Sequence, residues 1–476
     1  MNHPIHVNKH ITKIKIVTAF FDIGRGNWNY CNRSVDVYMN SFKKLLTFHD
    51  NIIVFLDDRY INSEFILNYK ENKKNGLTKK EVLFIPINRE WLNNNCLSWK
   101  KNYISEAIMN SEIYINKIRH RRHYPENSCS EYNAVNHSKI DFIKYAIDNR
   151  LVYDNEFICW CDFGYYNSIL SNDPFKYPYA ELDINKFDIN KINMCLRNKL
   201  EYNDFNMDFT LIYAPEKFTG SLFSANVENM IKLHHLYHEC LDELYKNYIT
   251  DDDQHVYLRC FHKKQELFNL FLSDTEWPKA LTYFQYNFTN HLDFIKYYIE
   301  SIKDGVFVEI GISNSDLSNF LLKNNKTCKL YAIDIYTSND SIGDKMYVET
   351  LIKLKTEFKN RIELLRCSSN DASNIIENDL DFVYIGGNHN YKYVLEDLEL
   401  WYKKLKIGGF IICNNAIDIN DDGRNDEGDV QIELSPGSYH KYGVINACKT
   451  FVEKNNLSFS KYNNQIIIFK PIYSKY

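Results

Sequence analysis

Short apolar segments alternate with amphipathic helical segments throughout the second half of the chain, and this order allows few folds. Strand-like segments are expected at residues 306–312 (VFVEIGI), 329–336, 361–367, 380–387 and 408–415. Helical spacing is found between them, and an amphipathic helix at 291–305 precedes the first strand. Regular alternation of strand and helix predicts a doubly wound, Rossmann-like α/β domain with a parallel sheet.

The first half shows a similar alternation. Strand-like runs occur at residues 14–24, 51–58, 81–87 and 155–164. Helical runs are expected at 138–151, at 224–248 and after Asp253. Because 476 residues exceed one ordinary core, we predict two α/β domains. Their expected limits are residues 1–280 and 299–476, with a linker helix region at 281–298.

Composition and charge restrict the class of protein. Hydrophobic residues make up 45% of the chain and charged residues 25%, as is typical of folded globular domains. A formal net charge of -5 provides no broad basic field, so nucleic acid is not an expected partner. The 12 cysteines are scattered singly, which favours a reducing compartment. No apolar stretch approaches the ~18 residues of a membrane span and no signal segment is evident, so we expect a soluble cytoplasmic protein.

Acidic residues and a glycine mark the carboxyl ends of the strands in the second half, where doubly wound sheets bind ligands. Glu309 and Gly311 end the first strand, just before a helix whose first N–H groups are available to a ligand. Asp334 ends the second strand, 23 positions after Gly311, a spacing at which an acid can bind a ribose diol. Each signal is weak by itself, because strand ends often carry capping acids.

A longer pattern follows at residues 380–415 (LDFVYIGGNHNYKYVLEDLELWYKKLKIGGFIICNN) and 442–455 (YGVINACKTFVEKN). It resembles the class I S-adenosylmethionine-dependent methyltransferases that act on hydroxyl groups of sugars and small molecules. The resemblance implies S-adenosylmethionine as the cofactor and places His389 in the active site. The residues that it implies as cofactor contacts are Glu309, Gly311, Asp334 and either Ser368 or Ser369.

The chain departs from this family pattern where metal ligands are expected. Gly386 and Asn388 replace aspartates, and Asn414-Asn415 replaces an aspartate pair. A divalent ion that polarises an acceptor hydroxyl needs anionic oxygen ligands, so these replacements argue against metal-dependent methyl transfer. Two alternatives stay open: a metal-free enzyme with His389 as general base, and a domain without catalysis.

Three polar segments stand out in the first half: TAFFDIGRGNW (18–28), residues 136–166 with NHSKIDFI and FICWCDFGYY, and ITDDDQHVY (249–257). A nucleotide-sugar transferase needs an acid at a strand end to hold a divalent cation, basic groups for the diphosphate, and often a second acid for the acceptor. Structural roles explain single acids about as well. Asp22 can cap a turn, Asp162 can end a strand, and Asp251 to Asp253 can begin a helix.

The order and wording of these segments resemble the bacterial HtrL/YibB (WlaTC) family, regarded as glycosyltransferases of the GT-A class. The resemblance extends from about residue 15 to residue 284. It implies a GT-A-like domain that binds a nucleotide sugar together with Mn²⁺ or Mg²⁺. By the same resemblance, Asp162 would bind the metal, Arg25 and Lys139 the phosphates, and Asp253 would be catalytic.

Three further clusters each have a functional and a structural interpretation. Residues 418–429 match most positions of a calcium loop, but they follow a predicted strand, so an exposed acidic segment is favoured. His234, His235 and His238 share a helix face, as metal ligands do, but no acidic partner is evident and a partly buried polar face is favoured. The basic residues 117–123 can contact an anionic substrate or form an exposed helix face.

Together these patterns predict a bifunctional glycan-modifying protein. Its first domain would transfer a sugar from a nucleotide-sugar donor to a glycan or glycoconjugate, and its second domain would methylate a sugar hydroxyl. The alternative is a glycosyltransferase that carries a non-catalytic, methyltransferase-like binding module.

Overall fold

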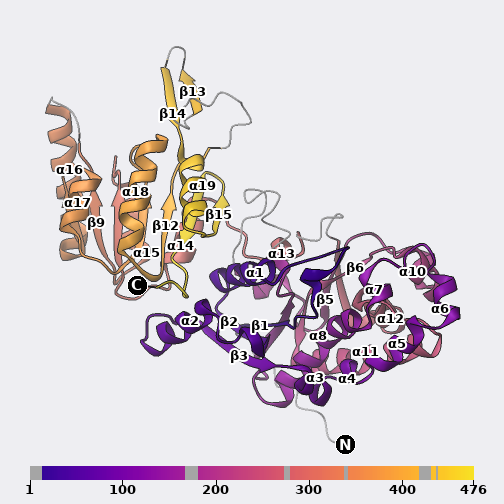
Figure 1. Cartoon of the computed structure of the whole chain (residues 1–476). Helices are drawn as coiled ribbons and strands as arrows, with labels where there is room; N and C mark the ends of the chain where they lie inside the picture. The colour runs from indigo at the N-terminus through magenta and orange to yellow at the C-terminus, as the bar shows by residue number, and fades with distance from the viewer. Residues whose placement is uncertain are drawn as a thin grey trace, which may run out of the picture. The chain divides into compact units, whose positions relative to one another are not determined.

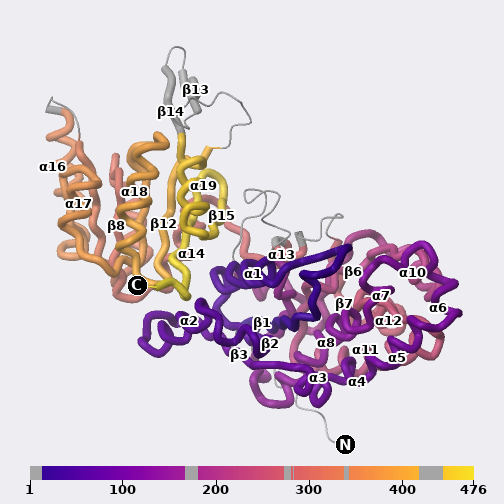
Figure 2. The backbone as a smooth tube through the Cα atoms, in the orientation of Figure 1, coloured from indigo at the N-terminus to yellow at the C-terminus, as the bar shows by residue number. Residues whose placement is uncertain are grey.

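The computed structural model describes residues 13–166, 181–272, 279–336, 341–417, 430–435 and 438–475. The chain divides into two compact units (Figures 1 and 2). Unit 1 contains Met1–Ile66, Lys80–Asp173 and Ala180–Tyr286. Unit 2 contains Leu67–Lys79, Pro174–Tyr179 and Asn287–Tyr476.

Unit 1 is built on a seven-stranded mixed sheet with the order β3-β2-β1-β4-β6-β5-β7. Its strands are β1 (Lys13–Phe20), β2 (Asn51–Asp57), β3 (Glu81–Ile87), β4 (Glu156–Cys161), β5 (Ile192–Leu196), β6 (Phe218–Asn226) and β7 (Phe268–Leu272). The four strands expected from the sequence are β1 to β4, and they run parallel. β6 runs antiparallel to both β4 and β5. The strand order reverses between β1 and β4, so a ligand site is expected beyond their carboxyl ends.

The helices of unit 1 surround this sheet (Figure 1). They are α1 (Val35–Phe48), α2 (Glu64–Lys74, which continues into unit 2), α3 (Arg89–Asn95), α4 (Leu97–Lys100), α5 (Asn102–Met109), α6 (Glu112–Lys117), α7 (Pro125–Ser128), α8 (Ser130–Asp148), α10 (Met207–Tyr213), α11 (Val227–Lys246), α12 (Asp253–Lys263) and α13 (Lys279–Phe284). The helix expected at 224–248 begins at Val227, because Asn226 ends β6 and caps α11 by accepting a hydrogen bond from the Asn229 N–H at 2.8 Å.

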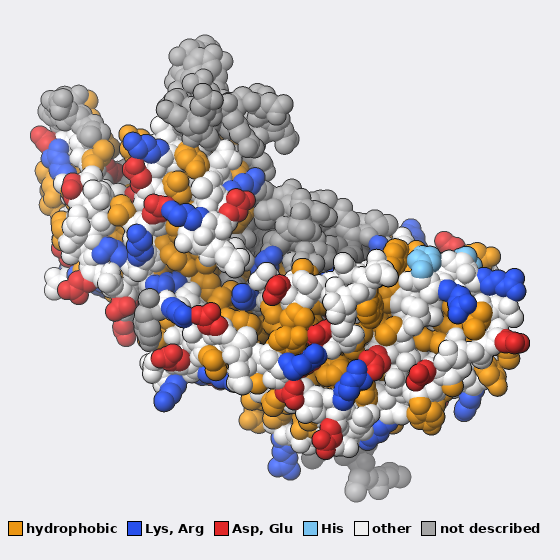
Figure 3. Space-filling model, viewed as in Figure 1, with side chains coloured by type: hydrophobic (Ala, Val, Ile, Leu, Met, Phe, Trp, Pro, Cys, Tyr) orange, Lys and Arg blue, Asp and Glu red, His pale blue; other side chains and the backbone are white. Residues whose placement is uncertain are grey.

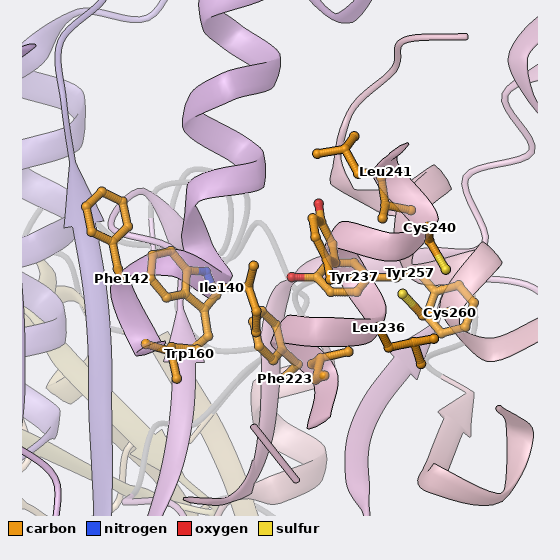
Figure 4. Packing of buried hydrophobic residues seen from close by; sticks show 14 of the residues in the cluster. Ile140, Phe142, Trp160, Phe223, Leu236, Tyr237, Cys240, Leu241, Tyr257 and Cys260 are labelled. Carbon is orange, nitrogen blue, oxygen red and sulfur yellow. The ribbon is translucent and has the colours of Figure 1, made fainter. Parts of the chain in front are cut away.

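Aromatic rings run through the core of unit 1 from helix to sheet to helix (Figure 4). Phe142 on α8 stacks with Trp160 on β4, at 6.3 Å between ring centroids and 9° between ring planes. Trp160 stacks in turn with Phe223 on β6, and Phe223 packs against Tyr257 on α12. Burying rings of this size fixes α8, β4 and α12 relative to one another, and these three elements carry the polar residues of the site.

Unit 2 contains the expected doubly wound sheet, with the order β10-β9-β8-β11-β12-β16-β15. Its strands are β8 (Val306–Ile310), β9 (Lys329–Ile333), β10 (Ile362–Leu365), β11 (Leu380–Ile385), β12 (Leu405–Cys413), β15 (Phe459–Tyr462) and β16 (Gln465–Phe469). β8 to β12 are parallel, which confirms the Rossmann-like prediction, while β16 is antiparallel to β12 and β15. Here the order reverses between β8 and β11.

The helices of unit 2 alternate with these strands. They are α14 (His291–Ile299), α15 (Asp316–Asn324), α16 (Ser341–Phe358), α17 (Ser369–Ile375), α18 (Tyr391–Lys404) and α19 (Val444–Lys454). Residues of α18 and α19 share one buried core with β8, β11 and β12. A separate hairpin is formed by β13 (Val430–Ser435) and β14 (Ser438–Tyr442). The possible calcium loop at 418–429 lies outside the described residues.

The surface carries charges of both signs. On the face drawn in Figure 3, Lys and Arg side chains are interspersed with Asp and Glu side chains. Across the described part of the chain, we find no helix that is both long enough and apolar enough to cross a membrane.

Candidate functional sites

The predicted cofactor residues of unit 2 come together at the carboxyl ends of β8 and β9. These strands are paired in parallel, with Ile310 opposite Ile333, so the residues after them meet at one edge of the sheet. Asp334 Oδ2 accepts hydrogen bonds from the N–H groups of Ile312 at 2.9 Å and Ser313 at 3.2 Å. The carboxylate thereby holds the turn that follows β8, a role that sequence spacing did not predict.

Glu309 is buried within β8, with 1% of its surface exposed, and its Oε2 accepts a hydrogen bond from the Ser318 hydroxyl. Burial raises the pKa of Glu309 to about 8. The Ser318 bond opposes this shift, and the charge of Asp334 adds to it. Near neutral pH Glu309 is therefore mostly a neutral acid that can donate as well as accept hydrogen bonds.

Gly311 lies where two backbone segments approach each other closely. Its φ of +84° is in the left-handed region, and a Cβ atom here would lie 2.5 Å from the backbone nitrogen of Gly387. No other residue type fits this position without displacing the turn. Gly386 is also crowded, because a Cβ atom on it would lie 2.7 Å from the Tyr384 ring. The Tyr384 ring therefore leaves little room for an aspartate side chain at position 386.

The two candidate serines have different partners. The Ser368 hydroxyl caps α17 by accepting from the Asp371 N–H at 3.1 Å, and it also donates to the Asp371 carboxylate at 2.6 Å. The Ser369 hydroxyl donates to Asp397 and accepts from Trp401 Nε1 at 2.8 Å, so it is bound to α18. Both hydroxyl groups thus have hydrogen-bond partners within the protein.

His389 is half-buried after β11, and Asn415 lies beside it. Its Nε2 is 3.0 Å from Asn415 Nδ2, and its backbone carbonyl accepts from the Gly443 N–H at 2.8 Å. Burial lowers the pKa of His389, which keeps the ring neutral near pH 7. Asn415 Nδ2 donates a hydrogen bond to His389 Nε2. This bond occupies the lone pair that His389 would need as a general base.

A cavity of 310 Å³ lies at the switch point of unit 1, beyond the ends of β1 and β4. Its charged lining consists of Asp22, Arg25, Arg33, Lys139, Asp162, Arg197, Asp252 and Asp253. The three segments singled out in the sequence, at 18–28, 136–166 and 249–257, thus meet in one place although they are far apart along the chain. All four predicted residues of this unit line the cavity.

Lys139 joins two of the predicted acids. Its ammonium group is 2.8 Å from Asp253 Oδ2 and 3.1 Å from Asp162 Oδ1, and it donates to the Gly220 carbonyl at 3.0 Å. Trp160 Nε1 donates to Asp162 Oδ1 at 2.7 Å, which connects the aromatic core to the site. A Cβ atom on Gly220 would lie 2.2 Å from the Asp253 carboxylate, so only glycine allows β6 to come this close.

The acids of this cavity differ in exposure and in proton affinity. The Asp162 side chain is 32% exposed and that of Asp253 is 5% exposed. Burial raises the pKa of Asp253 although Lys139 opposes the shift. Burial and the charges of Asp251 and Asp253 raise the pKa of Asp252. The pKa of Lys139 is raised by Asp162 and Asp253 in spite of burial, so the lysine remains charged.

Asp22 and Arg25 occupy the turn after β1. Asp22 Oδ1 accepts from the Gly24 N–H at 2.9 Å, which is the capping role that the sequence allowed, and its Oδ2 accepts from the Tyr60 hydroxyl at 2.9 Å. Arg25 donates to the Tyr38 hydroxyl at 3.0 Å and lies over the ring of Tyr132. Aromatic contacts therefore orient its guanidinium group along the cavity wall.

Two of the secondary clusters also have partners in the structure. The expectation that no acid accompanies the α11 histidines was wrong, because Asp141 on α8 bonds to both His234 and His238. Within the basic residues 117–123, Lys117 pairs with Asp208 at 2.7 Å and Arg121 with Glu126 at 2.8 Å. These pairs give at least part of that cluster a structural role.

Comparison with known proteins assigns the family. A family model described as a bacterial protein of unknown function (HtrL_YibB) matches residues 12–286, more than half of the chain. The chain belongs to the HtrL/YibB family. A second model, described as a methyltransferase domain, matches residues 308–416, so unit 2 carries a methyltransferase domain.

Two curated proteins are similar to parts of the chain. The chain is 28% identical over 288 residues to Protein HtrL of Escherichia coli (strain K12), covering 57% of this chain and 92% of that protein. It is 25% identical over 119 residues to the uncharacterized protein R132 of Acanthamoeba polyphaga mimivirus, covering 24% of this chain and 53% of that protein.

Solved structures similar to the chain include methyltransferases. An O-methyltransferase from Bacillus cereus in complex with S-adenosylhomocysteine (SAH) is 13% identical, with 39% of this chain and 83% of that chain covered and a TM-score of 0.29. An rRNA methylase from Streptococcus thermophilus is 14% identical, with 39% and 99% covered and a TM-score of 0.26. At these low TM-scores, the assignment depends on the family model and on the strand order.

Proposed function

We propose that unit 1 is a glycosyltransferase that uses a nucleotide-sugar donor, and that unit 2 transfers a methyl group from S-adenosylmethionine to a sugar hydroxyl. The two reactions would modify the same glycan or glycoconjugate in succession. The GT-A class, the donor and the acceptor all belong to this proposal.

The main support for the proposed glycosyltransferase activity is the cavity beyond the ends of β1 and β4. At 310 Å³ it lies at the lower end of the range for small-molecule sites. Guanidinium groups of Arg25 and Arg33 line it, and their planar donors suit the oxygens of a diphosphate. Carboxylates lie deeper, around Lys139, so one cavity offers groups for both the phosphates and the reacting sugar.

The carboxylates of the cavity are the proposed ligands of a divalent cation. Asp162, Asp252 and Asp253 offer the hard oxygen donors that Mn²⁺ and Mg²⁺ prefer, and the ammonium of Lys139 pairs with two of them. Asp162 has the accessible side chain and is the proposed ligand. A cation held there would neutralise the charge of the diphosphate as it leaves.

Asp253 is the proposed catalytic base of unit 1. Lys139 fixes its carboxylate by a contact of 2.8 Å, and the raised pKa of Asp253 makes it a better proton acceptor than an exposed aspartate. In this arrangement Asp253 would take the proton from the acceptor hydroxyl. Lys139 would position both acids and supply positive charge near the phosphates.

In unit 2, the proposed cofactor site is the edge formed by Glu309, Gly311 and Asp334. The left-handed turn at Gly311 brings backbone close to this edge, and a buried neutral acid and a strand-end carboxylate flank it. These groups suit the hydroxyl and amino groups of S-adenosylmethionine. His389, which burial keeps neutral, would accept the proton of the sugar hydroxyl once Asn415 releases Nε2.

One experiment tests the first activity directly. The full chain is incubated with a panel of nucleotide sugars and Mn²⁺ or Mg²⁺, and release of nucleoside diphosphate is measured. We expect cation-dependent release from at least one donor. Absence of both release and donor binding across the panel, with either cation, would refute the glycosyltransferase proposal.

A second experiment addresses unit 2 and its alternative, a non-catalytic module. The Asn415–His389 bond favours that alternative, because it engages the proposed base. Radiolabelled S-adenosylmethionine and sugar acceptors are supplied with and without EDTA. Since Gly386, Asn388, Asn414 and Asn415 stand in place of acidic ligands, we expect transfer that survives chelation. Cofactor binding without transfer to any acceptor would favour the module.

A further inference from the structure

A second group of potential ligands lies on the other side of α8 from the cavity of unit 1. Lys139 and Asp141 are two positions apart on this helix. At about 3.6 residues per turn, two positions rotate a side chain by roughly 200°, to nearly the opposite side of the helix. Lys139 lines the cavity, whereas Asp141 bonds to side chains of α11.

Helix α11 presents two imidazole rings to Asp141. His234 and His238 are one helical turn apart and therefore share a face. The Nε2 atoms of His234 and His238 lie 3.0 Å and 2.8 Å from the same oxygen, Oδ1 of Asp141. The three potential donor atoms all lie within 4.8 Å of one another. Asp141 and His238 are buried and His234 is half-buried.

The surroundings fix the carboxylate and leave one side open. Asp141 Oδ2 accepts from the Ser98 N–H at 2.8 Å, so Oδ1 is held facing the two rings. A cavity of 470 Å³ lined by Asp141 and His234 adjoins the group. Its two lysines have other partners, since Lys144 pairs with Asp148 at 2.6 Å and Lys100 donates to the Asn94 carbonyl at 2.8 Å.

We propose that Asp141, His234 and His238 bind a zinc ion, with a water molecule from the adjoining cavity as the fourth ligand. Two imidazole nitrogens and one carboxylate oxygen are a donor set that suits Zn²⁺, whereas Mg²⁺ and Ca²⁺ prefer oxygen ligands alone. Tetrahedral bonds of about 2.0 Å place donor atoms roughly 3.3 Å apart, so the three side chains need only small movements.

Zinc would replace two hydrogen bonds without a change of fold. In the metal-free group each imidazole donates its Nε2–H to Asp141, and in the zinc-bound group both Nε2 lone pairs face the ion. The Nδ1 atoms of His234 and His238 are buried without a hydrogen-bond partner in the described part of the chain, so nothing there fixes the tautomer. The bound ion would tie α8, which carries Lys139, to α11.

Zinc binding can be measured on the full-length chain. The protein is stripped with a chelator, and Zn²⁺ is added back in competition with a chromogenic chelator. We expect one tight site per chain, and Co²⁺ at that site should give the intense visible bands of four-coordinate cobalt. His234→Ala removes a half-buried ligand and should weaken binding at least 100-fold.

His235→Ala is the matched control, because His235 is the exposed neighbour on the same helix. It should leave Zn²⁺ affinity and the cobalt spectrum unchanged. Asp141→Asn keeps the side-chain size and should also weaken binding, and its folding can be checked by circular dichroism. Equal zinc affinity in the wild type and His234→Ala, or a cobalt spectrum of six-coordinate type, would overturn the proposal.

Discussion

Each of the two sheets has a switch point, between β1 and β4 in unit 1 and between β8 and β11 in unit 2, and the acids beside the two switch points have different partners. In unit 1, Asp162 and Asp253 share the ammonium of Lys139 inside a cavity. In unit 2, Asp334 is engaged by backbone N–H groups and Glu309 by the Ser318 hydroxyl. The same topology therefore supports acids joined by an ion pair with lysine in one unit and acids held by hydrogen bonds alone in the other.

This difference separates the chemistry that each site suits. In unit 1 the charged Lys139 pairs with both aspartates, although burial raises the pKa of Asp253, and this combination suits phosphate and cation binding. In unit 2, burial without a cation leaves Glu309 protonated near neutral pH, and glycine and asparagine replace further acids. Such a site suits a cofactor held by hydrogen bonds and does not require a divalent ion.

The largest expected effect is the loss of activity in Asp162→Asn. The variant keeps the size of the side chain and an oxygen for Trp160 Nε1, but it removes the anion proposed to hold the cation. We expect donor turnover to fall by about 10³-fold, the upper range for removal of one key electrostatic group. The melting temperature should stay within a few degrees of the wild type, because no core volume is lost.

Asp58→Asn provides the control for this variant. Asp58 directly follows β2, as Asp162 follows β4, but it is exposed and does not line the cavity. Its turnover should match the wild type. If Asp162→Asn kept full cation-dependent activity, Asp162 would not be the ligand of the cation, and the difference between the two switch points would not explain their proposed functions. If it mainly unfolded unit 1, Asp162 would be a structural strand end.

The next effect concerns stability and the buried ion pairs. Lys139→Met leaves Asp162 and Asp253 without their shared cation, and we expect unit 1 to lose about 3–5 kcal/mol in its free energy of unfolding. Lys144→Met lies on the same helix and breaks an exposed pair with Asp148, so it should cost no more than about 0.5 kcal/mol. Urea unfolding of both variants measures the difference. Equal losses would show that the ion pairs of Lys139 stabilise unit 1 no more than the pair of Lys144 with Asp148 does.

Sequence patterns predicted several strands that are buried on both faces, because these are continuous apolar runs bounded by turns, but they missed β5 and β16, which are buried as well. The predicted strands β4 (EFICWC) and β11 (LDFVYI) are of this kind. β6 (FTGSLFSAN) was not predicted, because it mixes polar and apolar residues and ends in the cap of α11. Yet β6 supplies Gly220, whose missing side chain makes room for the Asp253 carboxylate.

The candidate residues were predictable where a strand end marks them and not where two helices meet. Asp162 and Asp334 follow apolar strands, so topology alone places them at a ligand edge. Asp141 is 93 positions from His234 and sits on a different helix, and no spacing rule connects the two. The second role of Asp334, holding the turn after β8, depends on hydrogen bonds that only the folded chain shows.

A smaller effect is expected for cofactor binding in Asp334→Ala. Loss of a charge-assisted hydrogen bond should weaken S-adenosylmethionine binding by about 1.5–3 kcal/mol, or roughly 10- to 150-fold. Asp344→Ala, which removes an exposed acid paired with Arg366, should leave the affinity unchanged. Titration calorimetry measures both. Unchanged affinity in Asp334→Ala would limit Asp334 to its role in the turn.

The last effect is a pH dependence of unit 2 that originates in Glu309. Its pKa is about 8 in the folded chain and near 4.5 in the unfolded chain, so between these values the folded state holds one more proton than the unfolded state. The contribution of Glu309 to stability is therefore complete below about pH 4.5 and is lost as pH rises through about 8.

Within that window the free energy of unfolding should fall by at most about 1.4 kcal/mol per pH unit. Hydrogen exchange of the β8 and β9 amides isolates unit 2 from unit 1, and it can be followed at pH 6 and pH 8 after correction for intrinsic rates. Glu309→Gln cannot ionise, so its protection should change less with pH than that of the wild type. Glu377→Gln, at an exposed position, should behave as the wild type does. If protection in the wild type and in Glu309→Gln changed equally with pH, Glu309 would be ionised in the folded chain. The contrast between the ion-paired acids of unit 1 and the protonated Glu309 of unit 2 would then fail.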